Sequence, residues 1–416
     1  MNFIENGKNH LEKHCTVLYG MSRSGSILTS LNCALLDRDR EKVSQIKEFL
    51  SQHTVKYRLE DAARLIRNKS RLRIAYLLPS NEAETADILV EQSRKLIELG
   101  HEVILYSHSP RDERSTNEVP FILVHPDNNL SDIVPDSDVV VAGSWDLVID
   151  ALRINAPLKY HFAQGGSYIF EFEKLSQRMK DIIVTAFVQP LKILTVSAVM
   201  QQSIQWLFGR NSIVVPNALD RSIFYARSGH KSPKKPQILL TGSDDEKSGG
   251  HEMVIGTLFS LKELGHKFNI KWITGDKLCK DYSSLGLEIT QYASPSPKEA
   301  GEIYRESDIY ICGSYYEVDA RPALEAMACG CAVVTSGNGA VREYAEDGFN
   351  CLVFEPGNII QLAEKLGLVL SDQELRSRLK KGGLATAGKL TWKKTAKIME
   401  GEFKKSAACT EQAYII

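Results

Sequence analysis

The stretch that decides the fold is Glu317-Val-Asp-Ala-Arg-Pro-Ala-Leu-Glu325, which continues as Ala326-Met-Ala-Cys-Gly330. It follows an apolar run, Asp308-Ile-Tyr-Ile-Cys-Gly313, whose composition predicts a buried strand. Pro322 suits the first position of a helix and Gly330 its C-terminal cap, so the stretch predicts a loop followed by a helix. The free N–H groups of that helix would face the carboxyl end of the strand, where doubly wound α/β folds bind anions.

Two carboxylates stand eight positions apart across this loop-to-helix junction. Glu325 lies in the first helical turn, from which a carboxylate can accept hydrogen bonds from two sugar hydroxyls. Glu317 lies in the preceding loop, one ligand's length away. A site that contacts a diphosphate and several hydroxyls together indicates a nucleotide-sugar site.

The bulk composition is that of a globular protein with two or three domains in 416 residues. A formal net charge of −1 gives no support for nucleic-acid binding. The eight cysteines form no C-x-x-C pair, so we expect no zinc site and a reducing, cytoplasmic compartment. No apolar run has the length of a membrane span, and the N-terminus lacks the apolar segment of a signal peptide.

The chain changes character near residue 72. Residues 1–70 are polar and rich in charge, and they predict a mostly helical N-terminal extension. Beyond them, Ile74–Leu78 predicts a buried strand, Thr85–Leu99 an amphipathic helix and His101–Tyr106 a second strand. Strands that alternate with helices in this way indicate a parallel sheet.

One short internal sequence repeat, called the internal echo below, indicates two similar domains. Ser137-Asp-Val-Val-Val-Ala-Gly-Ser-Trp145 resembles Ser307-Asp-Ile-Tyr-Ile-Cys-Gly-Ser-Tyr315, and each predicts a buried strand that ends in a glycine turn. Two α/β domains in tandem explain this, with chance similarity of short strands as the rival explanation. Ala226–Pro236 is rich in Pro, Gly, Ser and Lys and is interpreted as the linker, which predicts domains at 71–228 and 229–390.

The C-terminal part continues the alternation. Further elements are predicted as a strand at Ala332–Thr335, a helix at Ala340–Glu346, a strand at Asn350–Phe354 and a final helix from Thr391. Asn358 with Gln361, and Ser371 with Glu374, have the spacing of capping boxes and predict two more helix starts.

Together these motifs resemble the family 4 glycosyltransferases of the two-domain GT-B fold, over roughly residues 72 to 404. The matching segments are Glu317–Gly330, Ala332–Thr335, Leu194–Ser197, Val214–Asp220 with Phe224, and Cys351–Gly357. The resemblance implies two Rossmann-like domains that face across a closing cleft, with the donor on the C-terminal domain and the acceptor on the N-terminal one. It also implies a return helix at 391–408 that packs on the N-terminal domain, with Trp392 as its anchor.

The resemblance further implies a reaction and assigns residues to it. A glycosyl group would move from a nucleotide-diphosphate sugar to an acceptor hydroxyl, with retention and without a metal or a resident cofactor. Glu317, Gln164 and Lys247 are expected to serve catalysis. Donor binding is assigned to Glu325, Lys247, Gly242, Arg321, Pro322 and Ala320. By itself, Glu325 could equally be a carboxylate favoured by the helix dipole.

The donor site departs from the family pattern at two places. Val318-Asp-Ala-Arg-Pro322 stands where family members commonly have Gly-x-Gly-Leu-Pro, although its backbone N–H groups can still contact an anion. Arg321 could pair with the donor phosphates or with Asp319 or a neighbouring glutamate, and both stay open. After the strand that ends at Gly242, Ser243 replaces the usual arginine, and three acids follow it before Lys247.

The acceptor side is less well marked. Pro79–Thr85, after the first strand, contains no glycine where family members often have a glycine-rich turn. Lys159–Gln164 resembles the strand that carries a frequent active-site histidine. Gln164 aligns best with that position, while His161 points to the opposite face and is interpreted as a packed or surface residue and not as a base. Asp136-Ser-Asp138 matches a D-x-D metal pattern but is interpreted as a turn into a strand.

We therefore predict a glycosyltransferase, of the hexosyltransferase type, for cell-surface polysaccharide or glycoconjugate synthesis. Its partners would be a nucleotide-sugar donor and a glycan, lipid-linked or other hydroxyl acceptor, with no nucleic acid. We expect it in the cytoplasm, with contact at the inner face of the membrane left open. The alternatives are an inactive GT-B scaffold that binds a glycan or protein partner, and a GT-B epimerase or phosphorylase.

Overall fold

The computed structural model describes residues 71–80, 83–110, 119–165, 167–227, 235–242, 250–275, 280–315 and 321–409. These residues form two compact units. Unit 1 contains the described residues of 71–195, 201–215 and 396–409, and unit 2 contains those of 196–200 and 216–395. Each unit has its own parallel sheet, as the alternation of strands and helices predicts.

Unit 1 is built on a seven-stranded sheet in the order β3-β2-β1-β4-β5-β6-β7, and every pairing is parallel. Its strands are β1 (Arg73–Leu77), β2 (Glu102–Ser107), β3 (Phe121–Leu123), β4 (Val139–Ala142), β5 (Leu158–Ala163), β6 (Lys192–Thr195) and β7 (Ser212–Val214). Its helices are α5 (Ala83–Glu98), α7 (Leu130–Ile133), η1 (Trp145–Leu147), α8 (Val148–Arg153), α9 (Ser167–Phe170), η2 (Phe172–Lys174), α10 (Gln177–Phe187) and α11 (Ala198–Phe208), although the start of α11 falls within unit 2.

Unit 2 is built on a six-stranded parallel sheet in the order β10-β9-β8-β11-β12-β13. Its strands are β8 (Gln237–Thr241), β9 (Asn269–Thr274), β10 (Ile289–Ala293), β11 (Ile309–Cys312), β12 (Ala332–Ser336) and β13 (Cys351–Phe354). Its helices are α12 (His251–Glu263), η4 (Ser283–Leu285), α13 (Pro297–Arg305), α14 (Arg321–Cys329), η5 (Gly339–Glu343), α15 (Ile359–Ser371) and α16 (Gln373–Ala387).

The sheet of unit 2 is buried on both faces, which is why its strands are apolar without alternation. Ile238 and Leu240 of β8 belong to one core cluster, together with residues of α12, α15 and α16. Leu239, between them, belongs to a second cluster that includes residues of α13 and α14. Successive side chains of a strand point to opposite faces, so these two clusters place helices on both sides of the sheet, which is the doubly wound arrangement.

The internal echo occupies the same place in both sheets. β4, from the first copy, pairs with β1, and β11, from the second copy, pairs with β8. In each unit the echo strand therefore lies beside the first strand, at the point where the strand order reverses direction. The prediction of two related α/β units is confirmed by this common topology.

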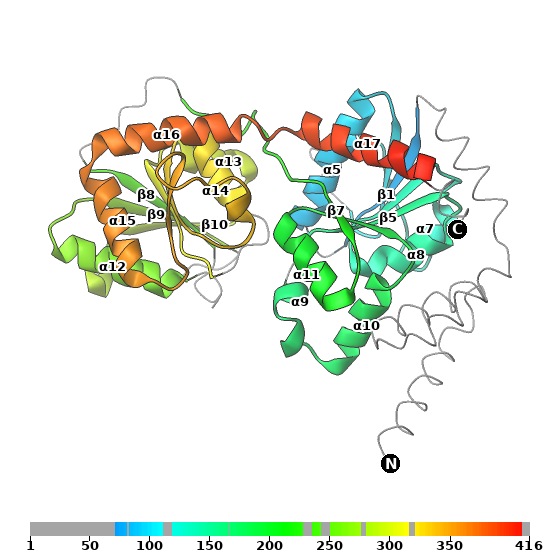
Figure 1. The fold of residues 1–416 in the computed structure, drawn as a ribbon, viewed down its shortest axis with the longest axis horizontal. Helices are drawn as coiled ribbons and strands as arrows, with labels where there is room; N and C mark the ends of the chain where they lie inside the picture. The colour runs from blue at the N-terminus through cyan, green and yellow to red at the C-terminus, as the bar shows by residue number, and fades with distance from the viewer. Residues whose placement is uncertain are drawn as a thin grey trace, which may run out of the picture. The chain divides into compact units, whose positions relative to one another are not determined.

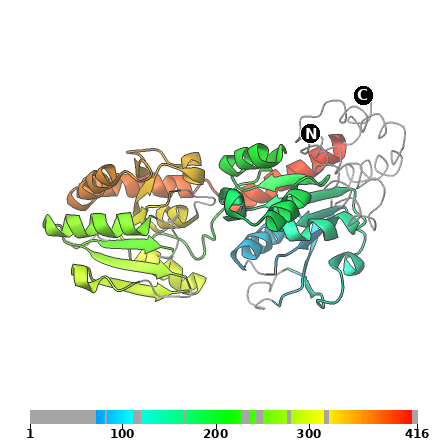
Figure 2. The ribbon, with the colours of Figure 1, turned by 90° about the horizontal axis from the view of Figure 1, so that it is seen from below.

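The last helix, α17 (Trp392–Cys409), returns to unit 1 from Ala396 onward (Figure 1). Both views place its red ribbon against the strands of unit 1 (Figure 1, Figure 2). The ring of Phe403 packs on Tyr160 with 5.1 Å between centroids, and Met399 Sδ accepts from the Tyr76 hydroxyl at 3.7 Å. The Lys394 N–H donates to Thr391 Oγ1 at 3.4 Å, which confirms Thr391 as the N-cap.

Trp392 is buried, but it belongs to unit 2 and not to the returning part of α17. The expectation that it anchors the return on the N-terminal domain stays a prediction. The two contacts named above come from Met399 and Phe403, which lie in the part of α17 that belongs to unit 1.

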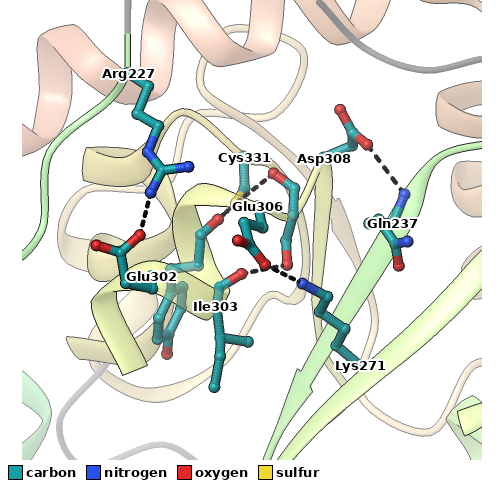
Figure 3. Close-up of polar contacts among 10 residues, drawn as sticks. Arg227, Gln237, Lys271, Glu302, Ile303, Glu306, Asp308 and Cys331 are labelled. Carbon is teal, nitrogen blue, oxygen red and sulfur yellow. Dashed lines mark hydrogen bonds and ion pairs between the residues drawn. The ribbon is translucent and has the colours of Figure 1, made fainter. Parts of the chain in front are cut away.

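The linker composition predicts a division between the units at 228/229. In the structure the division falls at Val215/Pro216. Leu219 and Phe224 join a core cluster of unit 2, where the Phe224 ring meets Tyr304 edge-on at 5.6 Å. Arg227, at the edge of the predicted linker, forms an ion pair with Glu302 (Figure 3). The segment before the predicted linker thus already belongs to unit 2. Most of the linker itself, at 228–234, lies outside the described residues, and so does the predicted extension at 1–70.

Two local predictions are corrected. Gly339–Glu343 is a 3-10 helix, whereas an α-helix over Ala340–Glu346 is predicted. The N-cap of α16 is Asp372, whose side chain accepts from the Leu375 N–H at 2.9 Å, whereas Ser371 is predicted for that role. Ser371 Oγ donates instead to the Gly367 carbonyl at 2.6 Å, because Ser371 is the last residue of the preceding helix.

Candidate functional site

The candidate donor site lies at the carboxyl ends of β8 and β11 in unit 2. These neighbouring strands flank the reversal of strand order, where doubly wound sheets bind their ligands. Three described segments meet there: the end of β8 at Gly242, the start of α12 at Gly250, and the loop after β11 at Gly313. The sequence prediction placed the donor site at this edge of the sheet.

Gly242 stands directly after β8 and has a φ of +103°, which favours glycine. Its N–H donates to the Ile273 carbonyl at 3.0 Å, so the turn remains attached to β9. The Thr241 hydroxyl, one residue earlier, lies 2.8 Å from the Tyr310 hydroxyl of β11. The predicted contact residue Gly242 therefore occupies a tightly held turn at the switch point.

The start of α12 lies directly against the loop after β11. Gly250 is the N-cap of α12, with a φ of +64°, and a Cβ added there would lie 2.1 Å from the Gly313 carbonyl oxygen. A glycine N-cap carries no side chain to cover the first N–H groups of the helix. The N-terminus of a 13-residue helix therefore opens where the strand ends of β8 and β11 meet.

The loop that leads towards Glu317 is held at its first residues. The Ser314 carbonyl accepts hydrogen bonds from Ser336 Oγ at 2.5 Å and from Asn338 Nδ2 at 2.8 Å. Ser336 is the last residue of β12, the next strand of the sheet, and Asn338 follows that strand. Three residues of the predicted site, Glu317, Ala320 and Lys247, lie outside the described residues.

The helix after this loop is α14, which begins at Arg321, so Pro322 is its second residue. Arg321, Pro322 and Glu325 are all half-buried. At the other end of the helix, Gly330 has a φ of +84° and the Cys331 N–H donates to the Ala326 carbonyl at 2.9 Å. The predicted glycine C-cap is confirmed, and α14 presents its N-terminus at the same edge of the sheet as α12.

Glu325 has a partner that the sequence prediction missed. The hydroxyl of Tyr304, on α13, donates a hydrogen bond to its carboxylate. Burial raises the pKa of Tyr304 well above its ordinary value, and the negative charge of Glu325 raises it further, so the phenol stays a donor. Tyr304 packs beside Tyr310 with 6.0 Å between ring centroids, and this contact connects Glu325 to the turn after β8.

In unit 1, Gln164 and His161 have different surroundings. Gln164 follows β5, is 8% exposed, and donates from Nε2 to the Thr85 carbonyl of α5 at 3.0 Å. His161 is 1% exposed and packs edge-on against Phe187 with 4.8 Å between ring centroids. Burial, with the positive charge of Arg210, lowers the pKa of His161 to about 3. His161 is a packed residue, as predicted, and the amide of Gln164 already helps to hold α5.

An open groove of about 750 Å³ lies elsewhere in unit 2, along α16. Phe349, Arg378 and Lys381 are among its lining residues, and none of the lining residues belongs to β8, β11 or α14. Its volume alone would suit a ligand, but it lacks the strand ends and helix N-termini that meet at Gly242. We therefore place the candidate site at the switch point and not in this groove.

Two further features bear on the chemistry. Within the described ranges, no three His, Cys, Asp or Glu side chains are grouped so that they could hold a metal ion. Every helix in those ranges is too short or too polar to cross a membrane.

Comparison with known proteins identifies relatives of this chain. A family model described as Glycosyl transferases group 1 matches residues 225–385. Spore coat protein SA of Bacillus subtilis is 23% identical over 368 residues, which cover 79% of this chain and 97% of that protein. D-inositol 3-phosphate glycosyltransferase of Stackebrandtia nassauensis is 32% identical over 105 residues, which cover only 25% of this chain and 24% of that protein.

Solved structures share the fold. Alr3699/HepE of Anabaena, in complex with UDP and glucose, matches with a TM-score of 0.64 at 15% sequence identity, over 80% of this chain and 100% of that chain. At this level of identity the likeness concerns the fold alone. The chain has the GT-B fold with two parallel sheets of the Rossmann type, and its residues 225–385 are related to the group 1 glycosyl transferases.

Proposed function

We propose that this protein is a retaining glycosyltransferase that moves a hexosyl group from a nucleoside-diphosphate sugar to an acceptor hydroxyl. The observation that carries the proposal is the position of Glu325. It lies one helical turn after the start of α14 at Arg321, and not in the first turn as predicted. The helix begins at the edge of the sheet where the turn after β8 and the N-terminus of α12 also lie. This edge combines helix N-termini for a diphosphate with a carboxylate for hydroxyls, and it lies within the segment that matches the group 1 model.

Each site residue has a proposed task. Glu325 accepts from the ribose hydroxyls, and Glu317 accepts from hydroxyls of the donor sugar. Lys247 and Arg321 neutralise the diphosphate, while the backbone around Gly242, Ala320 and Pro322 supplies further contacts. In unit 1, Gln164 serves the acceptor. The charge on the leaving diphosphate is met by these cations and by helix dipoles, so we propose that the reaction needs no metal and no resident cofactor.

The relatives suggest where to begin with substrates. Alr3699/HepE was solved with UDP and glucose, so uridine diphosphate hexoses are the first donors to test. The acceptor would be a glycan, a lipid-linked sugar or another hydroxyl, in the synthesis of a cell-surface polysaccharide or glycoconjugate. We propose a cytoplasmic protein that works at the inner face of the membrane.

The test is a donor panel. The purified full chain would be incubated with UDP-, GDP-, dTDP- and ADP-sugars, and slow hydrolysis of the donor would be measured with and without EDTA. We expect hydrolysis of at least one donor, unchanged by EDTA. If no donor is hydrolysed and no nucleoside diphosphate binds in calorimetry, the proposed function is wrong. Activity that disappears with EDTA and returns with manganese or magnesium would contradict metal independence.

The role of Glu325 is tested with a matched pair of variants. Glu325→Ala removes a charge-assisted contact and should weaken binding of the preferred nucleoside diphosphate by about 1.5–3 kcal/mol. Glu374→Ala is the control, since Glu374 is an exposed glutamate in the first turn of α16. Equal affinities for Glu325→Ala and the wild type would remove Glu325 from the site.

A further inference from the structure

We propose that His251 and Trp272 are positioning residues for the donor diphosphate, because they hold the two consecutive carbonyl groups of Thr241 and Gly242. The inference rests on the proposed function, in which the backbone after β8 meets the diphosphate. Neither residue needs to touch the ligand. Their task is to keep these two carbonyl oxygens directed into the core, so that the oxygens do not face the anion.

Trp272 holds the second of these carbonyls. It lies in β9, its side chain is fully buried, and its Nε1–H donates to the Gly242 carbonyl at 2.7 Å. An indole has only this one polar group, and a buried indole N–H usually finds an acceptor. The orientation of the Gly242 peptide is therefore tied to a large side chain of the core.

His251 holds the first carbonyl. It is the first residue of α12, is 8% exposed, and places Nε2 2.9 Å from the Thr241 carbonyl oxygen. A carbonyl oxygen only accepts, so Nε2 must carry the proton that is donated. His251 thus joins the N-terminus of α12 to the end of β8, the two elements that would bind the diphosphate.

The two donors belong to one stack of rings. His251 and Trp272 lie 5.0 Å apart between ring centroids with 27° between their planes, and Tyr282 also stacks on Trp272, at 6.1 Å. Stacked rings cannot rotate independently, so the two N–H groups keep a common direction. Carbonyl oxygens carry partial negative charge, and hydrogen bonds into this stack keep both oxygens directed at the rings and not at an anion.

A side chain at Gly242 would crowd this stack. A Cβ added to Gly242 would lie 3.0 Å from His251 Cε1, in addition to the strain of its positive φ. The Gly242 N–H is also used, since it donates to Ile273. Both polar groups of the Gly242 backbone are therefore bonded to protein, and the conformation of this residue is set before any ligand binds. Such preorganisation lowers the cost of binding.

The experiment compares variants that keep or remove one N–H group. A glutamine places its amide nitrogen near the position of histidine Nε2, whereas an asparagine places it near Nδ1. We expect His251→Asn to weaken UDP binding about tenfold and His251→Gln to restore most of that loss. The donor KM should rise in the same order, with kcat changed less, because the residue acts on the bound diphosphate and not on the acceptor.

The tryptophans provide a second comparison. Trp272→Phe removes the N–H group and part of the ring, and we expect UDP affinity to fall about tenfold. Trp392→Phe is the control, because Trp392 is also buried in unit 2 and its Nε1 has no hydrogen-bond partner. Both variants remove the same atoms, so a general effect of cavity formation would appear in both.

The outcomes separate the inference from the proposed function. Thermal unfolding without ligand first establishes that each variant is folded at the temperature of the titration. Equal UDP affinities for wild type, Trp272→Phe and His251→Asn would overturn the positioning role while leaving the donor site intact. Weakening by His251→Gln as large as by His251→Asn would also overturn it. If the wild-type protein binds none of UDP, GDP, dTDP and ADP, the proposed function and this inference are both wrong.

Discussion

The amino ends of the two sheets are built alike. In unit 1 the Asp138 carboxylate accepts from the Arg73 N–H at 2.8 Å, and the Asp138 N–H donates to the Arg73 carbonyl at 2.9 Å. In unit 2, Asp308 and Gln237 make the same two bonds at 3.0 and 2.8 Å (Figure 3). The Ser-Asp of the internal echo therefore joins the first strand of each unit to its neighbour, and Asp138 has a structural task within its D-x-D pattern.

The carboxyl ends of the same strands differ. β8 ends at Thr241, whose carbonyl is held by His251 of α12, and is followed by Gly242, whose carbonyl is held by Trp272 of β9. β1 is followed by Leu78 and Pro79, and the Leu78 N–H donates to the Tyr106 carbonyl at 2.8 Å, with no glycine in the turn. The amino ends of the two units are joined in the same way, whereas at the carboxyl ends the described residues of unit 2 include a glycine turn held by side chains and those of unit 1 do not.

The largest expected difference between the units is in their stability at acidic pH. His161 faces Ala142 across β4 and β5, and the matching position in unit 2 is Thr335, which does not titrate. The pKa of His161 is lowered from 6.5 to about 3, so the folded state binds fewer protons than the unfolded chain. Below pH 6.5 the unfolding free energy of unit 1 should therefore fall by about 1.4 kcal/mol per pH unit.

Hydrogen exchange at pH 7 and pH 5 would measure this for peptides from β5 and from β12. We expect β5 to lose more protection, and His161→Phe to remove most of the difference. His125→Gln is the control, because the His125 side chain is 70% exposed. Equal acid sensitivity of the two sheets, or no effect of His161→Phe, would contradict this prediction.

The shared aspartates should differ in what they contribute. Asp308 is fully buried and lies 3.3 Å from Lys380 Nζ, so Asp308→Ala leaves a mostly buried cation and a strand N–H without their carboxylate. We expect a loss of about 3 kcal/mol in unfolding free energy. Asp138→Ala should cost about 2 kcal/mol, because its partner Arg73 is 52% exposed.

Urea denaturation would measure both variants, with Asp127→Ala as an exposed control. A larger loss for Asp138→Ala than for Asp308→Ala would show that the two bridges are not ranked by the burial of their cations.

A smaller effect is expected from the hydroxyl that holds Glu325. Tyr304→Phe removes the donor to its carboxylate, and UDP affinity should fall by about 1 kcal/mol. Tyr76→Phe removes a buried hydroxyl of unit 1, which contacts Met399, and should leave UDP affinity unchanged. Calorimetry that finds the same affinity for both variants would show that Glu325 binds the ligand without this support.

The smallest effect has the opposite sign. Gly256 in α12 and Gly401 in α17 are exposed helical residues, and a Cβ added to either meets no atom within 4 Å. Replacement by alanine should raise stability by about 0.5–1 kcal/mol each. If the units melt separately, Gly256→Ala should move the transition of unit 2 and Gly401→Ala that of unit 1. A single transition raised equally by both would indicate that the units unfold together.

Sequence patterns predict the structural features that depend on residues close together in the chain. The echo strands, the glycine cap of α14 and the N-cap Thr391 are local signals, and the structure confirms all three. The boundary at Val215/Pro216 was missed because Leu219 and Phe224 carry no local mark of the core that they join.

The supporting side chains of the site were missed for the same reason. Tyr304, Trp272 and His251 stand on α13, β9 and α12, and each is an ordinary apolar or polar position in its own element. Their bonds to Glu325, Gly242 and Thr241 arise only when the strands take the order β9-β8-β11. No spacing in the chain specifies that order.

The return of α17 has a consequence for synthesis on the ribosome. Apart from 196–200, the described residues of unit 2 form one stretch that ends at Thr395, whereas unit 1 also needs residues from Ala396 onward. Tyr160 and Tyr76 obtain their partners on α17 only when Met399 and Phe403 leave the exit tunnel. We therefore expect the nascent chain to complete its second unit before its first, which reverses the usual order in which domains emerge and fold.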